Sequence, residues 1–335
     1  MCCHEFVLTT FVIYNHIVYR SQAQSLEGFK DENNSTQEKS EAEPLQLDVF
    51  SEEQNQLDSS ENLTQSTESL FGELRAKGLY YNFQNILHDI NINKLKTGLV
   101  DLMHVHNRSE WIYNTRKEYQ ARDRIQKKKR MIFINVESVY NSKREMITKA
   151  VARRLRGRHM TTPPKFMRDI RLIIGTGAAR RLYYSLTKYS TANHVRQVLS
   201  THAVVLERYW LHHAAFSIGK HFNTTEELPP LGHPIYKWPS DLLVPDVLFF
   251  INATKTPYAL GFNQPYTDFT DRLIEVYRRA EGVKVVELNP NRNYPNIVRQ
   301  IINYVVENYR HHPDIHVPDF DVQLNVQAVD MLNNR

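Results

Sequence analysis

Cysteine and long apolar runs are nearly absent from this 335-residue chain. Its two cysteines, Cys2 and Cys3, are adjacent, so they cannot link distant parts of the fold by a disulfide. The chain has no other cysteine for a thiolate metal site. A reducing compartment fits this usage. No apolar run approaches the roughly 20 residues that a membrane-spanning helix needs, and the densest stretch, residues 6–19, is broken by Thr, Asn and His. We therefore expect neither an integral membrane protein nor a membrane partner.

Charge is distributed unevenly along the chain, which has a formal net charge of +5. Residues 1–80 hold 14 acidic and 5 basic side chains, while the remainder holds 23 acidic and 37 basic ones. Residues 21–69 are also rich in Ser, Glu, Gln and Asn without a helical or strand period. Such a segment buries too little apolar surface to offset its ordering entropy. The sequence therefore predicts a disordered acidic arm over residues 1–78.

The first 20 residues match a targeting peptide poorly. Arg20 is their only Lys or Arg, and Glu5 interrupts the apolar stretch. A transit peptide is Arg-rich and poor in acidic residues, and a signal peptide begins with a basic region. These residues alone therefore do not predict import into an organelle.

Residues 79–130 are predicted to form a helical, basic extension. Apolar residues recur there at three- and four-residue spacing, at Leu79, Phe83, Ile86, Leu87 and Ile90. Residues 116–130 are strongly basic, and we interpret them as a solvated helix face or linker. A nuclear or nucleic-acid patch is the alternative, but aromatic residues for base stacking are not interleaved through the run. Nucleic acid is therefore not an expected partner.

Short apolar runs are typical of buried strands, and three of them occur at 131–136, 203–206 and 247–251, while Val-Lys-Val-Val-Glu-Leu at 283–288 is a fourth strand candidate. Helical patterns separate them, and a last long helix is predicted over residues 294–309. Such an order favours an α/β fold whose parallel sheet is covered by helices on both faces. We expect this domain over residues 131–310, with a C-terminal tail over 311–335.

Three strings carry a resemblance to a known family: Arg-Arg-Leu-Tyr-Tyr-Ser-Leu at 180–186, Val-Val-Leu-Glu-Arg-Tyr-Trp at 204–210, and His-Pro-Ile-Tyr-Lys-Trp-Pro-Ser-Asp-Leu-Leu-Val-Pro-Asp at 233–246. In this order they resemble the thymidylate kinase superfamily, most closely its mitochondrial UMP-CMP kinase branch. The resemblance implies a P-loop NTPase-type sheet and phosphoryl transfer from ATP to a pyrimidine nucleoside monophosphate, with Mg²⁺ as cofactor. It also implies a homodimer and a mitochondrial location, with the cytoplasm as the alternative.

The loop after the first strand departs from the family pattern G-x-x-x-x-G-K-[ST]. Ser138 and Lys143 stand at the glycine positions, where a Cβ costs about 1–3 kcal/mol per strained residue. Arg144 stands at the lysine, and Glu145 at the hydroxyl that binds Mg²⁺. A shift by one residue makes Lys143 the loop lysine but places Arg144 at the hydroxyl. The other loop candidates for cofactor binding are Asn141 and Ser142.

Two further sites differ from the family. Glu207 replaces the aspartate of an Asp-Arg pair, and the lid region, residues 253–268, contains no arginine. Loss of one preorganised donor costs roughly 2.7–4 kcal/mol, so the combined losses predict transfer slowed by at least about 10⁴-fold. By resemblance the catalytic candidates are Arg144, Glu207 and Arg208, and the metal candidates are Glu145 and Glu207.

The acceptor side departs less from the family. Tyr184 stands where the family stacks an aromatic ring on the nucleobase, and Arg208 where an arginine holds the monophosphate. Lys188 and Phe216 are further substrate-binding candidates. The alternative for Tyr184 and Phe216 is core packing. For Arg208 it is an ion pair with Glu207 or with the aspartate at position 246.

Three hypotheses follow from these residues. The first is a nucleotide-binding pseudokinase with weak or no transfer activity. The second is an active pyrimidine nucleoside monophosphate kinase in which Lys143 and Arg144 share the phosphate role. The third is a partner-binding scaffold that uses its basic stretch or its acidic arm. The adjacent histidines His212 and His213 are interpreted as ordinary helix residues, because no carboxylate or cysteine stands at ligand spacing.

Overall fold

The computed structural model describes residues 65–93, 98–122, 129–139, 144–252, 267–288 and 294–318. All of them belong to the larger of the two compact units into which the chain divides, Asp58–Arg335. Most of the predicted arm, most of the predicted lid and the loop residues Asn141, Ser142 and Lys143 lie outside the described residues. Within the described part, no helix combines the length and apolar character that crossing a bilayer requires.

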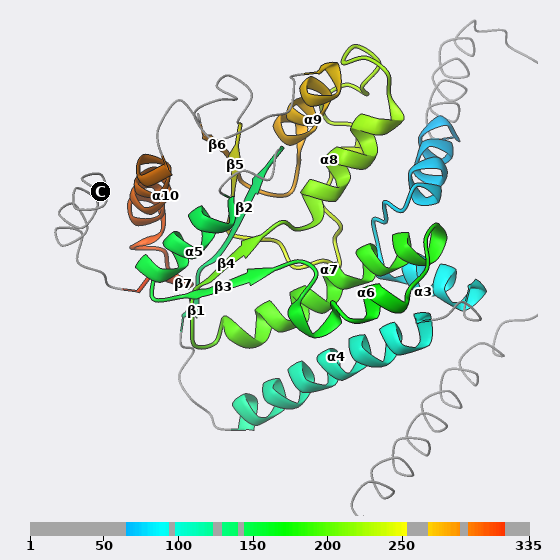
Figure 1. The fold of residues 1–335 in the computed structure, drawn as a ribbon. Coiled ribbons are helices and arrows are strands. Elements are labelled where there is room, and N and C mark those ends of the chain that lie inside the picture. The colour runs from blue at the N-terminus through cyan, green and yellow to red at the C-terminus, as the bar shows by residue number, and fades with distance from the viewer. Residues whose placement is uncertain are drawn as a thin grey trace, which may run out of the picture. The chain divides into compact units, whose positions relative to one another are not determined.

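A five-stranded parallel sheet forms the centre of the fold, in the order β3–β4–β2–β5–β6 (Figure 1). Its strands are β2 (Phe133–Ser138), β3 (Arg158–Thr161), β4 (Val204–Glu207), β5 (Val247–Ile251) and β6 (Val285–Leu288). Every residue of β2, β4 and β5 is buried, as expected for parallel strands with both faces covered. The apolar runs correctly indicated four of these strands. The edge strand β3 was not predicted.

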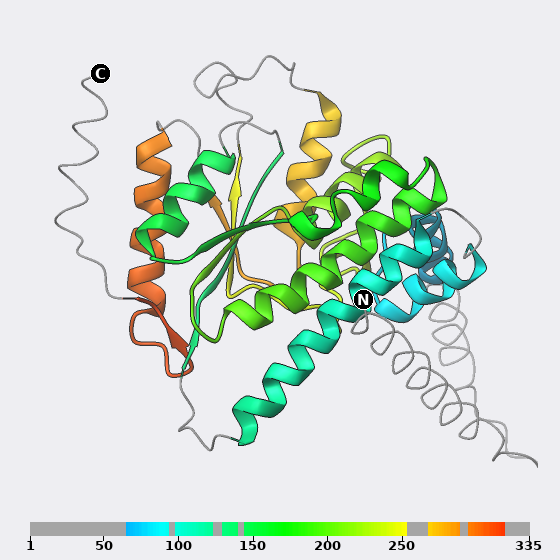
Figure 2. The same cartoon turned by 60° about the horizontal axis from the view of Figure 1, so that its bottom comes forward.

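Helices cover both faces of this sheet, which confirms the predicted fold class (Figure 2). One face packs on α5 (Arg144–Arg154) and α10 (Tyr294–Tyr309), and their shared core includes Ile134 and Val136 of β2. Phe133 of β2 points to the other core, which contains residues of α7 (Ala178–Val198), α8 (Trp210–His221) and α9 (Asp268–Arg279). Alternate residues of one strand therefore serve two separate cores.

The N-terminal extension is part of the second core. It consists of helical residues 65–76, α3 (Phe83–Ile92) and α4 (Leu99–Arg122), and α3 and α4 pack on α7. Leu74 and Leu79 are fully buried in the same apolar cluster as α7 and α8. The predicted arm therefore ends too late at residue 78, because the apolar residues after 64 fold onto the domain. The extension is continuous with the sheet domain rather than a separate unit.

The C-terminal boundary also differs from the prediction. Residues 311–318 were expected in a tail, but β7 (Ile315–His316) pairs in parallel with β1 (Arg130–Met131). Ile315 and Val317 are buried in the core beneath α5 and α10. The single apolar alternation Ile-His-Val is too short a pattern to predict this strand from the sequence.

Two aspartates of the 233–246 string serve the fold. Asp241 accepts hydrogen bonds from the Phe83 amide at 2.6 Å and from the Tyr189 hydroxyl at 2.8 Å, so it ties the extension to α7. Asp246 accepts from the Phe133 amide at 2.7 Å and pairs with Arg130. These bonds give both aspartates of the string a structural role.

Gly78 joins the helical residues 65–76 to the rest of the extension and offers a test of this docking. Its φ is +92°, and a Cβ there would lie 2.7 Å from the Cβ of Arg181 on α7. We expect Gly78→Ala to lower the free energy of unfolding by about 1–3 kcal/mol, because it adds backbone strain and a clash. Urea denaturation followed by circular dichroism measures the loss.

Gly72 provides the matched control, because it lies inside the helical residues 65–76 and a Cβ would meet no atom within 4 Å. Gly72→Ala should raise stability by about 0.5–1 kcal/mol through helix propensity. Equal stability of the two variants would contradict docking of the extension on α7.

Candidate functional site

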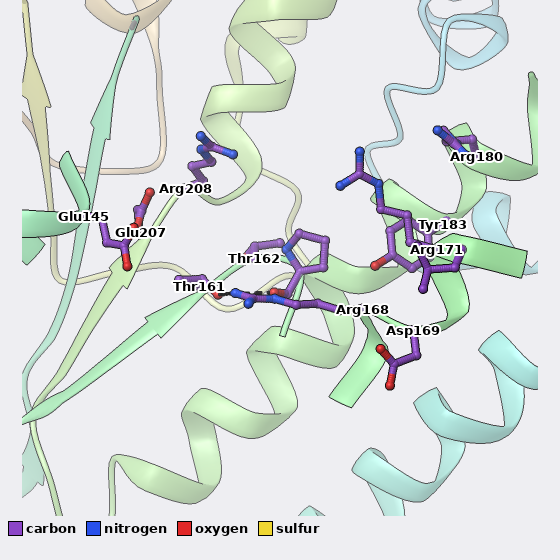
Figure 3. A pocket seen from close by; sticks show the side chains of 12 residues that line it. Glu145, Thr161, Thr162, Arg168, Asp169, Arg171, Arg180, Tyr183, Glu207 and Arg208 are labelled. Atoms are coloured by element: carbon purple, nitrogen blue, oxygen red, sulfur yellow. Dashed lines mark hydrogen bonds between the residues drawn. The ribbon is translucent and has the colours of Figure 1, made fainter. Parts of the chain in front are cut away.

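A cleft of about 820 Å³ lies at the carboxyl ends of β3 and β4 (Figure 3). In the register of the sheet Thr161 is the neighbour of Glu207, so the last residues of the two strands meet at this edge. Ligands of open α/β sheets bind at this edge. The lining side chains are Glu145, Thr161, Thr162, Pro163, Arg168, Asp169, Arg171, Leu172, Arg180, Tyr183, Glu207 and Arg208.

Arg144, the first residue of α5, is turned into the protein. Its side chain is 1% exposed, and its Nη1 donates to the Ser138 carbonyl at 3.2 Å and to the Ser138 hydroxyl at 2.8 Å. Its Nε donates to Oε1 of Glu207 at 3.2 Å. The guanidinium at the position of the family lysine is thus engaged inside the fold. Ser138, another predicted loop residue, is its hydrogen-bond acceptor.

Glu207 is the carboxylate partner of this guanidinium. Burial alone would raise the pKa of Glu207, but the nearby His159, whose Nε2 lies 3.5 Å from Oε2, and Arg144 outweigh it. The net pKa therefore lies below its ordinary value, and Glu207 is anionic at neutral pH. Its charge is already compensated inside the protein.

Glu145, the other metal candidate, is exposed on α5. Lys149, one turn along the helix, places its Nζ 2.5 Å from Oε1 of Glu145 and lowers the pKa of this carboxyl. No group of three or more His, Cys, Asp or Glu side chains suited to a metal ion occurs among the described residues. Glu145 and Glu207 both line the cleft, but each already has a cationic partner.

Arg208 lines the cleft from the turn between β4 and α8. Its φ of +60° places the backbone in the left-handed region, which costs about 1–3 kcal/mol for a residue with a Cβ. Burial, followed by repulsion from Arg144, lowers the pKa of the Arg208 guanidinium. The strained turn aims this half-buried residue at the edge of the sheet. Of the predicted acceptor residues, Arg208 is the one that lines the cleft.

Tyr184, Lys188 and Phe216 lie outside the cleft lining. The guanidinium carbon of Arg171 lies 5.7 Å from the ring centroid of Tyr184. Phe216 is 44% exposed on α8 and packs edge-on against Phe269 of α9. Their roles in substrate binding stay predictions.

Lys188 is 4% exposed and is held within the second core. Its Nζ donates to the Tyr184 carbonyl at 2.6 Å and lies 2.7 Å from Nδ1 of His213. Burial lowers the pKa of Lys188 to about 7, although the nearby Glu137 acts to raise it. Burial also lowers the pKa of His213 well below its usual value. Lys188 therefore belongs to a buried polar cluster.

Glu137 of β2 is the carboxyl group of this cluster. Its Oε1 accepts from Nδ2 of Asn135 at 2.7 Å and from the Tyr209 amide at 2.8 Å. Burial raises the pKa of Glu137 despite these bonds. Sequence reasoning did not single out Glu137, although a carboxylate and an amide inside an otherwise apolar strand were a signal for a buried network.

The arginines of the cleft other than Arg208 were also missed. Arg168 follows the 3₁₀ helix Lys165–Met167, Arg171 lies on α6 (Ile170–Ile173), and Arg180 on the first turn of α7. They meet because the chain folds back over β3. Since β3 was not predicted, no pattern in the sequence placed these residues together.

Comparisons with known proteins give two distant similarities. Over 138 residues the chain is 29% identical to the human mitochondrial UMP-CMP kinase 2, a stretch that is 40% of this chain and 30% of that protein. The predicted resemblance is thereby confirmed as a sequence similarity, though the match spans less than a third of the relative's length. The solved thymidylate kinase of Candida albicans is 13% identical, with a TM-score of 0.40 over 55% of this chain and 95% of its own. No protein-family model matches.

The buried pair between Arg144 and Glu207 predicts a non-additive loss of stability. Arg144→Met should lower the free energy of unfolding by roughly 3–5 kcal/mol, because it leaves the Glu207 carboxylate without its cation. Glu207→Gln should also destabilise, and the double variant should lose much less than the sum of the two. Urea denaturation of the four proteins measures the coupling.

Glu145→Gln is the control for this cycle, because it breaks an ion pair that is exposed to solvent. Little or no change is expected for it. Additive losses in the Arg144 and Glu207 variants would show that the two charges do not stabilise each other in the folded protein.

The depressed pKa of Lys188 predicts a dependence of stability on pH. Between about pH 7 and pH 10 the folded protein holds a neutral Lys188, while the unfolded chain keeps its lysine protonated, so stability rises with pH. Lys188→Met lacks this gain. The free energy of unfolding of the wild type, relative to that of Lys188→Met, should therefore increase by up to about 1.4 kcal/mol per pH unit between pH 7 and 9.

The exposed Lys220 on α8 gives the control, since Lys220→Met should differ from the wild type by an amount that does not change with pH. Denaturation at pH 6, 7, 8 and 9 separates the two variants. A flat difference for Lys188→Met would mean that its amine titrates in the folded protein as it does in water.

Proposed function

We propose that this chain is a nucleotide-binding pseudokinase of the nucleoside monophosphate kinase type. Its cleft at β3 and β4 binds a pyrimidine nucleoside monophosphate, and phosphoryl transfer from ATP is weak or absent. Two observations support the binding half of this proposal: the similarity to a protein named as a UMP-CMP kinase, and the position of Arg208 in the cleft. Arginine suits this role because its planar fork can hold phosphate oxygens in pairs.

The proposed loss of phosphoryl transfer rests on the burial of Arg144. Phosphoryl transfer needs cations that are free to follow the charge on the transferred group. Arg144 instead bonds Glu207 and Ser138, with 1% of its side chain exposed. Releasing it would remove the hydrogen-bonded cation of the buried Glu207, and breaking a buried ion pair costs roughly 3–5 kcal/mol.

The same pair limits the role of Mg²⁺. Glu207 could contact the metal or a metal-bound water in a working kinase, but its carboxylate already binds a guanidinium. Glu145 would add a negative charge beside the ATP phosphates. ATP and Mg²⁺ are therefore expected as cofactors only if transfer survives. A mitochondrial location and a homodimer remain proposals from the similarity alone.

An active kinase is the second candidate, and it would depend on Lys143. The sharing of the phosphate role between Lys143 and Arg144 is disfavoured, because Arg144 is committed to Glu207. Lys143 lies outside the described residues, so an activity assay is needed to test phosphoryl transfer that depends on this lysine. A coupled ADP-release assay across UMP, CMP and dTMP measures it. Turnover at rates ordinary for such kinases, lost in Arg208→Gln, would overturn the pseudokinase proposal.

Nucleotide binding without transfer predicts a specific pattern of thermal shifts. UMP or CMP at a hundredfold excess over its dissociation constant should stabilise the protein by about 2.7 kcal/mol, because the ligand binds the folded state alone. Arg208→Gln should abolish the effect of the monophosphates.

Arg299→Gln is the matched control, since Arg299 is exposed on α10 and does not line the cleft. It should respond to monophosphates like the wild type. If none of the nucleotides changes the melting temperature of the protein, the scaffold hypothesis is favoured and this proposal is contradicted.

A further inference from the structure

Three arginines besides Arg208 line the cleft. Figure 3 shows Arg171 and Arg180 on the side away from Glu145 and Glu207, while the guanidinium of Arg168 extends toward Thr161 between the two sides. Among the described residues, none of the three forms an ion pair with a carboxylate within 4 Å. Their positive charge is therefore available to a ligand.

Neutral groups hold these three side chains in place. Nη2 of Arg168 donates to the Thr161 hydroxyl at 2.9 Å. Nε of Arg180 donates to the Gly175 carbonyl and its Nη2 to the Ile174 carbonyl, both at 3.2 Å. Arg171 lies over the ring of Tyr184. A guanidinium has five N–H donors, so each side chain is oriented while most of its donors remain for a ligand.

The carboxylates of the cleft do not cancel this charge. Glu145 pairs with Lys149 and Glu207 with Arg144, and neither cation belongs to the cleft lining. Asp169 is the remaining acidic side chain of the lining, and Figure 3 shows its carboxylate turned away from Arg171 and Arg180. The cleft thus presents more guanidinium groups than one phosphate requires, because a phosphate monoester carries about two negative charges near neutral pH.

We propose that Arg168, Arg171 and Arg180 form a second phosphate subsite, so that the cleft prefers a nucleoside di- or triphosphate to a monophosphate. One phosphate lies at Arg208, and the additional phosphates lie along the three arginines. This inference rests on the proposed function, since it names the ligand class of the same cleft. In this proposal, the segment 165–180 distinguishes ligands by the number of phosphates that they carry.

Isothermal titration with UMP, UDP and UTP, without Mg²⁺ and at fixed ionic strength, tests the subsite. The affinity should rise at least about tenfold from UMP to UTP, and this gain should shrink with added salt because it is electrostatic. In the double variant Arg171→Gln/Arg180→Gln, UTP should bind no more tightly than UMP, while the affinity for UMP stays within about twofold. Arg299→Gln should retain the full preference.

Inorganic tripolyphosphate separates the subsite from the proposed function. Equal affinities of the wild type for UMP and UTP would overturn the subsite and leave nucleotide binding intact. Binding of tripolyphosphate that is lost in the double variant, with no binding of any nucleotide, would support the arginine subsite and overturn the proposed function. No binding by nucleotides or tripolyphosphate would overturn both. Thermal denaturation of the double variant, expected to match the wild type, confirms that it is folded.

Discussion

The ion pair between Arg144 and Glu207 is the constraint on which the edge of the sheet depends. It joins the first residue of α5 to the last residue of β4, with side chains 1% and 9% exposed. A buried charge without a partner is costly, so each residue requires the other. The hydroxyl of Ser138 completes the arrangement and fixes the start of α5 against the end of β2. Two positions that resemble catalytic ones thereby hold three elements together.

Much of the family resemblance is explained by structure of this kind. Asp241 links the N-terminal extension to α7, and Asp246 binds both Arg130 of β1 and the Phe133 amide of β2. These bonds need the same residues whether or not a phosphate is ever transferred. The structural bonds of a string that resembles a kinase family therefore concern how the chain folds, and they are neutral on activity. Activity depends on the few residues at the strand ends, where this chain differs.

The elements that could be predicted are those whose pattern is local. The buried strands β2, β4 and β5 carry apolar runs, the strand β6 a partly apolar one, and the helix Tyr294–Tyr309 a clear stripe. The strand β3 has the sequence Arg-His-Met-Thr and was missed, because it is the sheet edge and only Met160 is buried. Arg208, which its motif marks as a candidate, lines the cleft, and its role in phosphate binding stays a prediction. The candidate Lys188 lies outside the cleft lining, with its amine hydrogen-bonded to the carbonyl of Tyr184 one helical turn earlier.

The charges of the cleft lead to one consequence for ligands. Its carboxylates at positions 145 and 207 are committed to Lys149 and Arg144, while Arg168, Arg171 and Arg180 are held by neutral groups. Carboxylates in use as ion-pair partners are poor ligands for Mg²⁺, and cations held by neutral groups are good ligands for phosphate. Because the carboxylates at 145 and 207 are paired with cations outside the cleft lining while the three arginines have no carboxylate partner, we propose that anion binding and weak phosphoryl transfer arise from the same arrangement. A substitution that restored phosphoryl transfer would therefore also alter anion binding.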